Sequence, residues 1–87
     1  MDNKAFIEKC INLVIAYYND KADKTNFKPI TTENVYVVWS CKTLQNNKAL
    51  LSTNVRDGMY YELTYNGDKG ELYFDAYKKW ENLCFKV

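Results

Sequence analysis

The 87-residue chain contains no histidine, a single arginine, one proline and three glycines. Without histidine, the commonest general base and metal ligand is missing. Arg56 stands alone, so bidentate recognition of phosphate or guanine has little support. No apolar run approaches the roughly 18 residues that a membrane span needs, and the first residues lack the layout of a signal peptide. We therefore expect a cytoplasmic protein without a membrane partner.

Charge of either sign is not in excess, because twelve basic and eleven acidic residues leave a net charge of +1. A balance of this kind is not the footprint of a dedicated nucleic-acid binder. Apolar residues make up 47% of the chain and aromatic residues 16%, which is typical of a folded domain rather than a disordered segment. The length predicts a single domain over residues 1–87.

Cysteine is present at three positions, Cys10, Cys41 and Cys84, an odd number without metal-ligand spacing. Neither a disulfide framework nor a zinc site is indicated. Each cysteine lies in an apolar run, where a free thiol behaves as a small hydrophobic group. We expect three buried, reduced thiols, with no metal and no cofactor.

Residues 3–18 have the period of an amphipathic helix, and Asp2 is placed to cap its N-terminus. The expected apolar stripe is broad and consists of Phe6, Cys10, Leu13, Val14 and Tyr17, with Ile7, Ile11 and Tyr18 beside them. Such a stripe is suited to lying across a sheet, and its breadth also favours a second copy of the chain against one flank.

A polar connector over residues 19–33 follows the helix, with a possible short helical turn from Asp20 to Lys24. Pro29 ends any helical continuation. The lysines of the connector, Lys21, Lys24 and Lys28, are balanced by three acidic residues, so a solvated linker competes with an arm that contacts an acidic partner.

Four short alternating segments over residues 34–77 predict an antiparallel β-meander, with strands at 34–44, 48–55, 59–65 and 71–77. The expected turns are Asn46–Asn47, residues 56–58 and residues 66–70, where asparagine and glycine tolerate positive φ. In the tail, residues 78–87, two structures compete: Ala76, Tyr77, Trp80, Leu83 and Cys84 fit a short helix capped by Asp75, and Leu83–Val87 fit a fifth, edge strand; we favour the helical turn. The predicted fold class is therefore α+β: an N-terminal helix packed on a four-stranded antiparallel sheet.

Alternation assigns side chains to the two faces of the sheet. In the first strand, Val35, Val37, Trp39 and Cys41 should face the helix, and Tyr36, Val38, Ser40 and Lys42 the other side. Tyrosines from three strands gather on that other side, where lysines could neutralise phosphate. The candidate binding residues are Tyr36, Lys42, Lys48, Tyr60, Tyr73 and Tyr77. The competing interpretation is that these rings only form cross-strand pairs that stabilise a small exposed sheet.

Glu62 and Asp75 are expected on adjacent strands and on one face. Paired carboxylates can hold a metal or perform acid–base chemistry when burial shifts one pKa, so a metal-dependent hydrolase is one hypothesis. Because lysines lie nearby in sequence, solvated ion pairs explain these residues more simply. A cysteine nucleophile is not favoured without histidine. We therefore expect a protein that is not an enzyme.

The amino-acid sequence of the predicted sheet also resembles that of a known family. WSCKTLQNNKALLST followed by DGMYYELTYNGDKGELYFDAYKKWEN resembles a family of short proteins encoded by phages and prophages of Gram-positive bacteria, described as a domain of unknown function. The resemblance covers roughly half of the chain and brings no known functional residues with it.

What the resemblance implies is a setting in the cytoplasm of a bacterial host. Small phage proteins without enzyme motifs often block a host complex, including defence machinery, or bind a signalling molecule. The first hypothesis is thus an inhibitor that binds a host protein complex. The alternative is a nucleotide sponge or single-strand nucleic-acid binder that uses the same rings.

Overall fold

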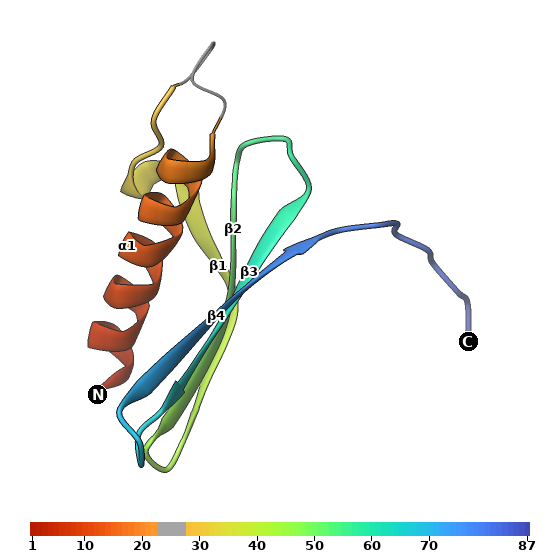
Figure 1. Cartoon of the computed structure of the whole chain (residues 1–87). Helices are drawn as coiled ribbons and strands as arrows, with labels where there is room; N and C mark the ends of the chain where they lie inside the picture. Colours follow the sequence, from red (N-terminus) through yellow and green to blue (C-terminus); the bar gives the residue numbers. More distant parts are fainter. Residues whose placement is uncertain (23–27) are drawn as a thin grey trace.

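A computed structural model describes residues 1–22 and 28–87. One helix, α1 (Asn3–Lys21), lies against a four-stranded sheet made of β1 (Val35–Thr43), β2 (Asn46–Thr53), β3 (Met59–Asn66) and β4 (Glu71–Lys78), with a 3₁₀ turn, η1 (Thr32–Asn34), before β1 (Figure 1). The strand order is β1-β2-β3-β4 and every pair is antiparallel. The predicted α+β meander is confirmed.

Helix α1 begins as predicted and ends three residues later than predicted. Asp2 caps it by accepting a hydrogen bond of 2.8 Å from the Ala5 amide. The three lysines of the predicted connector have different positions. Lys21 is the last residue of α1 and Lys28 is exposed, whereas Lys24 lies outside the described residues. The suggested helical turn from Asp20 to Lys24 likewise reaches beyond the described chain. None of the helices in residues 1–22 and 28–87 has the length and apolar character that a membrane crossing requires.

The core lies between α1 and the helix-facing side of the sheet. Phe6, Cys10 and Val14 succeed one another at four-residue intervals on α1 and are all fully buried. They pack with residues from three strands and from the segment before η1, namely Ile30, Val35, Ala49, Leu51, Tyr61 and Leu63. A core of this size explains why the domain needs large rings, and Tyr61 is the largest side chain in it.

The first hairpin turns two residues earlier than the sequence predicted. Thr43 pairs with Asn46, so Leu44 and Gln45 form the turn and the predicted turn residues Asn46 and Asn47 belong to β2. Contacts with the β3–β4 turn explain the difference. Asn46 Oδ1 accepts a 3.0 Å hydrogen bond from the Gly67 amide, and the Gln45 side chain donates to Asp68. A Cβ atom on Gly67 would lie 2.1 Å from the Gln45 carbonyl oxygen, so only glycine fits there.

Leu44 occupies the left-handed region with φ of 56°, and its side chain is exposed. Branched side chains are strained there, so Leu44→Gly should raise the free energy of unfolding by about 0.5–1 kcal/mol after the larger chain entropy of glycine is subtracted. Urea denaturation measures this change. Gln45→Gly is the control and should destabilise, because it loses the contact with Asp68 and relieves no positive φ. A loss of stability in Leu44→Gly would contradict the strain argument.

Strand β1 contains a β-bulge that the alternation pattern did not predict. Val37 pairs with Leu51 and Trp39 with the adjacent Leu50, so Val38 is the extra residue. A bulge reverses the facing of every residue after it. The prediction that Trp39 and Cys41 face the helix is therefore wrong, and Cys41 is exposed rather than buried.

Residues 79–87 form neither the helical turn nor the edge strand suggested by the sequence. They are extended and exposed, and they lead away from the sheet on the side opposite α1 (Figure 1). Asp75 remains inside β4, paired with Glu62, and so is not available as a helix cap. Cys84 is exposed as a result, which leaves Cys10 as the one cysteine whose predicted burial is confirmed.

Candidate functional site

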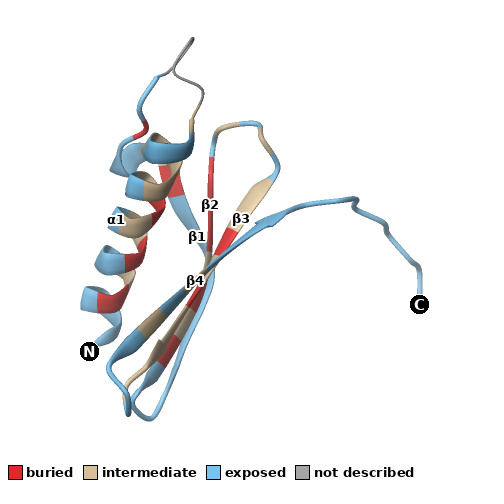
Figure 2. Ribbon diagram, viewed as in Figure 1, coloured by how far each residue is buried: buried red, intermediate tan, exposed pale blue. Residues whose placement is uncertain are grey.

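The face of the sheet that points away from α1 has no covering layer in the part of the chain that the structure describes. Cross-strand pairing defines its members, because residues directly opposite one another share a face. We call this surface the open face; it consists of Tyr36, Trp39, Cys41, Thr43, Asn46, Lys48, Leu50, Ser52, Tyr60, Glu62, Thr64, Asn66, Glu71, Tyr73, Asp75 and Tyr77. Figure 2 shows the buried residues on the inner side of α1, on β2 and on β3, whereas β4 is largely exposed.

Four tyrosines lie on the open face, as the sequence predicted. Ser52 of β2 is opposite both Tyr36 and Tyr60, and Tyr60 is in turn opposite Tyr77, so three rings follow one cross-strand row. Tyr36, Tyr73 and Tyr77 are 48%, 50% and 53% exposed, and Tyr60 is half-buried. The most exposed rings therefore project from the two edge strands, β1 and β4.

Trp39 is the open-face residue that the alternation pattern missed. It is 43% exposed and opposite Leu50, because the bulge turned it to this side. The same bulge removes Lys42 from the site. Lys42 pairs with Asn47 on the helix-facing side, and its ammonium group donates a 2.7 Å hydrogen bond to the carbonyl of Leu44. Of the six candidate binding residues, the structure brings together all but Lys42.

Acidic residues outnumber basic ones on the open face. Lys48 lies 3.6 Å from Glu62, and Asp75 and Glu71 are on the same side. The Tyr73 hydroxyl donates a 3.2 Å hydrogen bond to Glu71, and this bond together with the charge of Glu71 raises the pKa of Tyr73. Tyr73 thus presents a protonated phenol in a surface whose one lysine is already paired.

Glu62 and Asp75 are direct cross-strand partners, so the prediction that they share a face is confirmed. The ion pair of Glu62 with Lys48 supports the solvated interpretation. Asp75 is exposed, and an exposed carboxylate lacks the burial that tunes a catalytic group. Within residues 1–22 and 28–87, no cluster of three or more acidic, histidine or cysteine side chains is arranged to hold a metal ion.

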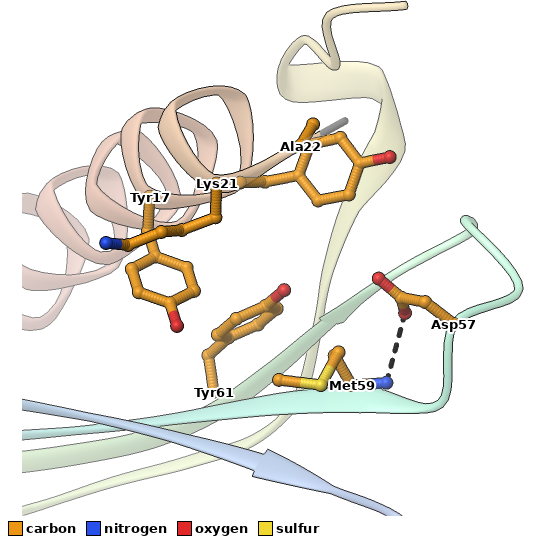
Figure 3. Close-up of a pocket in the computed structure, with 7 residues that line it drawn as sticks. Tyr17, Lys21, Ala22, Asp57, Met59 and Tyr61 are labelled. Atoms are coloured by element: carbon orange, nitrogen blue, oxygen red, sulfur yellow. Dashed lines mark hydrogen bonds between the residues drawn. The ribbon is translucent and has the colours of Figure 1, made fainter. Parts of the chain in front are cut away.

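A cavity of about 260 Å³ lies on the other side of the sheet, between the end of α1 and β3 (Figure 3). Its wall includes Tyr17, Lys21, Asp57, Met59 and Tyr61. Asp57 accepts a 3.0 Å hydrogen bond from the Met59 amide, and burial, then the charge of Asp57, raises the pKa of Tyr61 to about 12. The volume of this cavity is below the roughly 300–1,000 Å³ of ordinary ligand sites, so we interpret the cavity as a gap in side-chain packing.

Sequence reasoning did not find this cavity, because its residues come from two segments far apart in the sequence, whose rings the periodicity assigned to the core. The same geometry separates Lys21 from the open face. Its ammonium group lies 6.0 Å from the centre of the Tyr17 ring, on the helix side of the sheet.

Comparison with known proteins gives one finding. No curated protein and no solved structure matches the chain significantly. A protein-family model does match, over residues 7–87, and so covers most of α1, the whole sheet and the C-terminal segment. The chain therefore belongs to a family of unknown function, DUF6275.

Proposed function

We propose that this protein is a non-enzymatic binding protein whose open face docks onto a protein partner. One observation carries the proposal: Tyr36, Trp39, Tyr73 and Tyr77 are each about half exposed on a face that the described chain leaves uncovered. Tyrosine and tryptophan combine large contact area with few rotatable bonds, and they are enriched at the centres of protein interfaces. Cross-strand pairing alone does not require four rings left this exposed.

The charge of the open face favours a protein over a nucleic acid. Its carboxylates, Glu62, Glu71 and Asp75, face one lysine, Lys48. A single-strand binder combines stacking rings with a positively charged groove, and counterion release from phosphate drives its affinity. Here a phosphate backbone would meet net negative charge. The open face therefore has the aromatic rings that a nucleotide or single-strand binder needs, but it lacks the positively charged side chains.

The setting that we propose follows from the resemblance given above. A small phage protein would act in the cytoplasm of a bacterial host and inhibit a host complex such as a defence system. An interface of standard size needs about 800 Å² from each partner. A large ring buries ~150–250 Å² in all, so four rings that are about half exposed supply roughly 300–500 Å², and the remainder would come from the rest of the open face.

Replacing both Tyr73 and Tyr77 with serine should abolish partner binding and leave the fold intact. Rings at the centre of an interface contribute about 2 kcal/mol or more each, so the loss of both should lower affinity by roughly a thousandfold. Quantitative co-purification of the tagged protein from its host, with partners counted by mass spectrometry, measures the loss. Leu44→Ser is a matched control, because it removes an exposed hydrophobic side chain at a turn.

Two outcomes would contradict the proposal. Partners recovered equally with the double variant would remove the open face from the interface. Binding of oligonucleotides or cyclic nucleotides, followed by Trp39 fluorescence and weakening steeply with salt, would instead establish the alternative.

A further inference from the structure

We infer that the C-terminal arm, residues 79–87, adds as a strand to the free edge of β1 in a second copy of the chain. In the described part of the chain, the arm is held at its first residue by a 2.7 Å hydrogen bond from the Lys79 amide to the Gly58 carbonyl. Every residue of the arm is exposed, and Trp80 and Phe85 are 92% and 77% exposed. A monomer gains nothing from such an apolar arm.

The sequence of the arm has the alternation of a β-strand, although the arm is not part of the sheet. Leu83, Phe85 and Val87 alternate with Cys84 and Lys86, the period of a half-buried strand. The arm nevertheless pairs with no strand of its own sheet. The family match extends to residue 87, so this segment is part of the shared domain and not an unrelated extension.

Strand β1 offers the free sheet edge with which the arm could pair. It is an edge strand of nine residues, of which Val35 alone is buried. An edge strand exposes a row of unpaired backbone groups, and proteins usually protect it with charged residues. β1 carries one charge, Lys42, and presents exposed Val37 and Val38.

The other edge is better protected. β4 carries charged residues along its length at Glu71, Asp75 and Lys78. The unprotected edge of β1 is therefore the better acceptor.

A second copy is needed because β1 lies at the opposite edge from the origin of the arm. Three strand spacings of about 4.8 Å separate β4 from β1, a distance of about 14 Å. Nine extended residues reach about 30 Å, so an arm that crossed its own open face would keep only about half its length for pairing. On a second copy the whole arm is available. Reciprocal exchange between two chains closes the assembly as a two-fold dimer.

This inference does not depend on the proposed function, because strand addition uses the backbone edge and leaves the rings of the open face available. Its first test is the oligomeric state by sedimentation velocity across the micromolar range. The natural chain should be a dimer, and Leu83→Lys with Phe85→Lys should be a monomer that keeps the helical circular dichroism signal of α1. Asn12→Lys with Ala16→Lys adds the same charge on the exposed side of α1 and should stay dimeric.

The second test uses two exposed thiols on the segments that the inference pairs, Cys41 on β1 and Cys84 on the arm, while Cys10 is buried. Bismaleimidoethane should link two chains through Cys41 and Cys84, and either single serine variant should lose the link. Amide exchange should also be slower across residues 35–43 in the dimer than in the double-lysine variant. A monomeric natural chain would overturn the inference. So would a Cys84–Cys84 link that persists in Cys41→Ser, or equal amide exchange in the two proteins.

Discussion

Phe6→Ala should cost about 3–5 kcal/mol of the free energy of unfolding, the range for truncating a fully buried ring. Phe6 is completely buried on the face of α1 that packs on β2 and β3. Small domains have total stabilities near the low end of about 5–15 kcal/mol, so most of the stability would be lost. Urea denaturation followed by circular dichroism measures the effect.

The matched comparison is Tyr77→Ala, which removes a ring of similar size from the open face. Because Tyr77 lies on the uncovered side of the sheet and pairs with Tyr60, its loss should cost only about 0.2–1 kcal/mol. Equal costs at Phe6 and Tyr77 would show that the open-face rings are core residues and not a surface reserved for binding.

Alkaline pH should destabilise the protein through Cys10 and Tyr61. Burial raises the pKa of Cys10 from 9.0 to about 12, and burial with nearby Asp57 raises that of Tyr61 from 10.0 to about 12. Below pH 9 both groups are protonated in the folded and the unfolded chain. Above it the unfolded chain releases protons first, so the free energy of unfolding falls until the folded pKa is passed. Three pKa units at Cys10 correspond to about 4 kcal/mol.

Denaturation curves at a series of pH values from neutral to about pH 11 test this prediction. Cys10→Ala should be less stable at neutral pH, because a buried side chain is lost, and its stability should fall much less between about pH 9 and pH 11. Tyr61→Phe should remove the part of the loss that begins near pH 10. A Cys10→Ala profile parallel to that of the natural protein would exclude the buried thiol as the cause.

Much of the fold could be predicted from the sequence, because local pattern and tertiary packing agree over most of it. The helical period placed Phe6, Cys10 and Val14 in the core, and strand alternation placed all four strands. The errors occur where a backbone irregularity or a distant contact decides. Contacts between the two turns at Gly67 place the first hairpin turn at Leu44 and Gln45. Leu44 has no intrinsic preference for the positive φ that it adopts there, so the sequence did not indicate this turn.

The candidate site shows the same division. Tyr60, Tyr73 and Tyr77 were assigned to the right face because their strands are regular, and Tyr36 because it precedes the bulge. Trp39 and Lys42 were assigned to the wrong faces because they follow it. A bulge cannot be recognised in a run such as VYVVWS, because residues on both faces of the strand are apolar and the alternation pattern shows no break.

The central claim is that the open face contacts a protein, and site-specific photo-crosslinking in cells that produce the protein tests it most directly. Benzoylphenylalanine would replace Tyr73 or Tyr77 on the open face, or Asn12 on the exposed side of α1 as the control. We predict covalent adducts with the same protein from both open-face positions and none from Asn12. Equal adducts from Asn12, adducts with nucleic acid alone, or no adducts at Tyr73 and Tyr77 would contradict the claim.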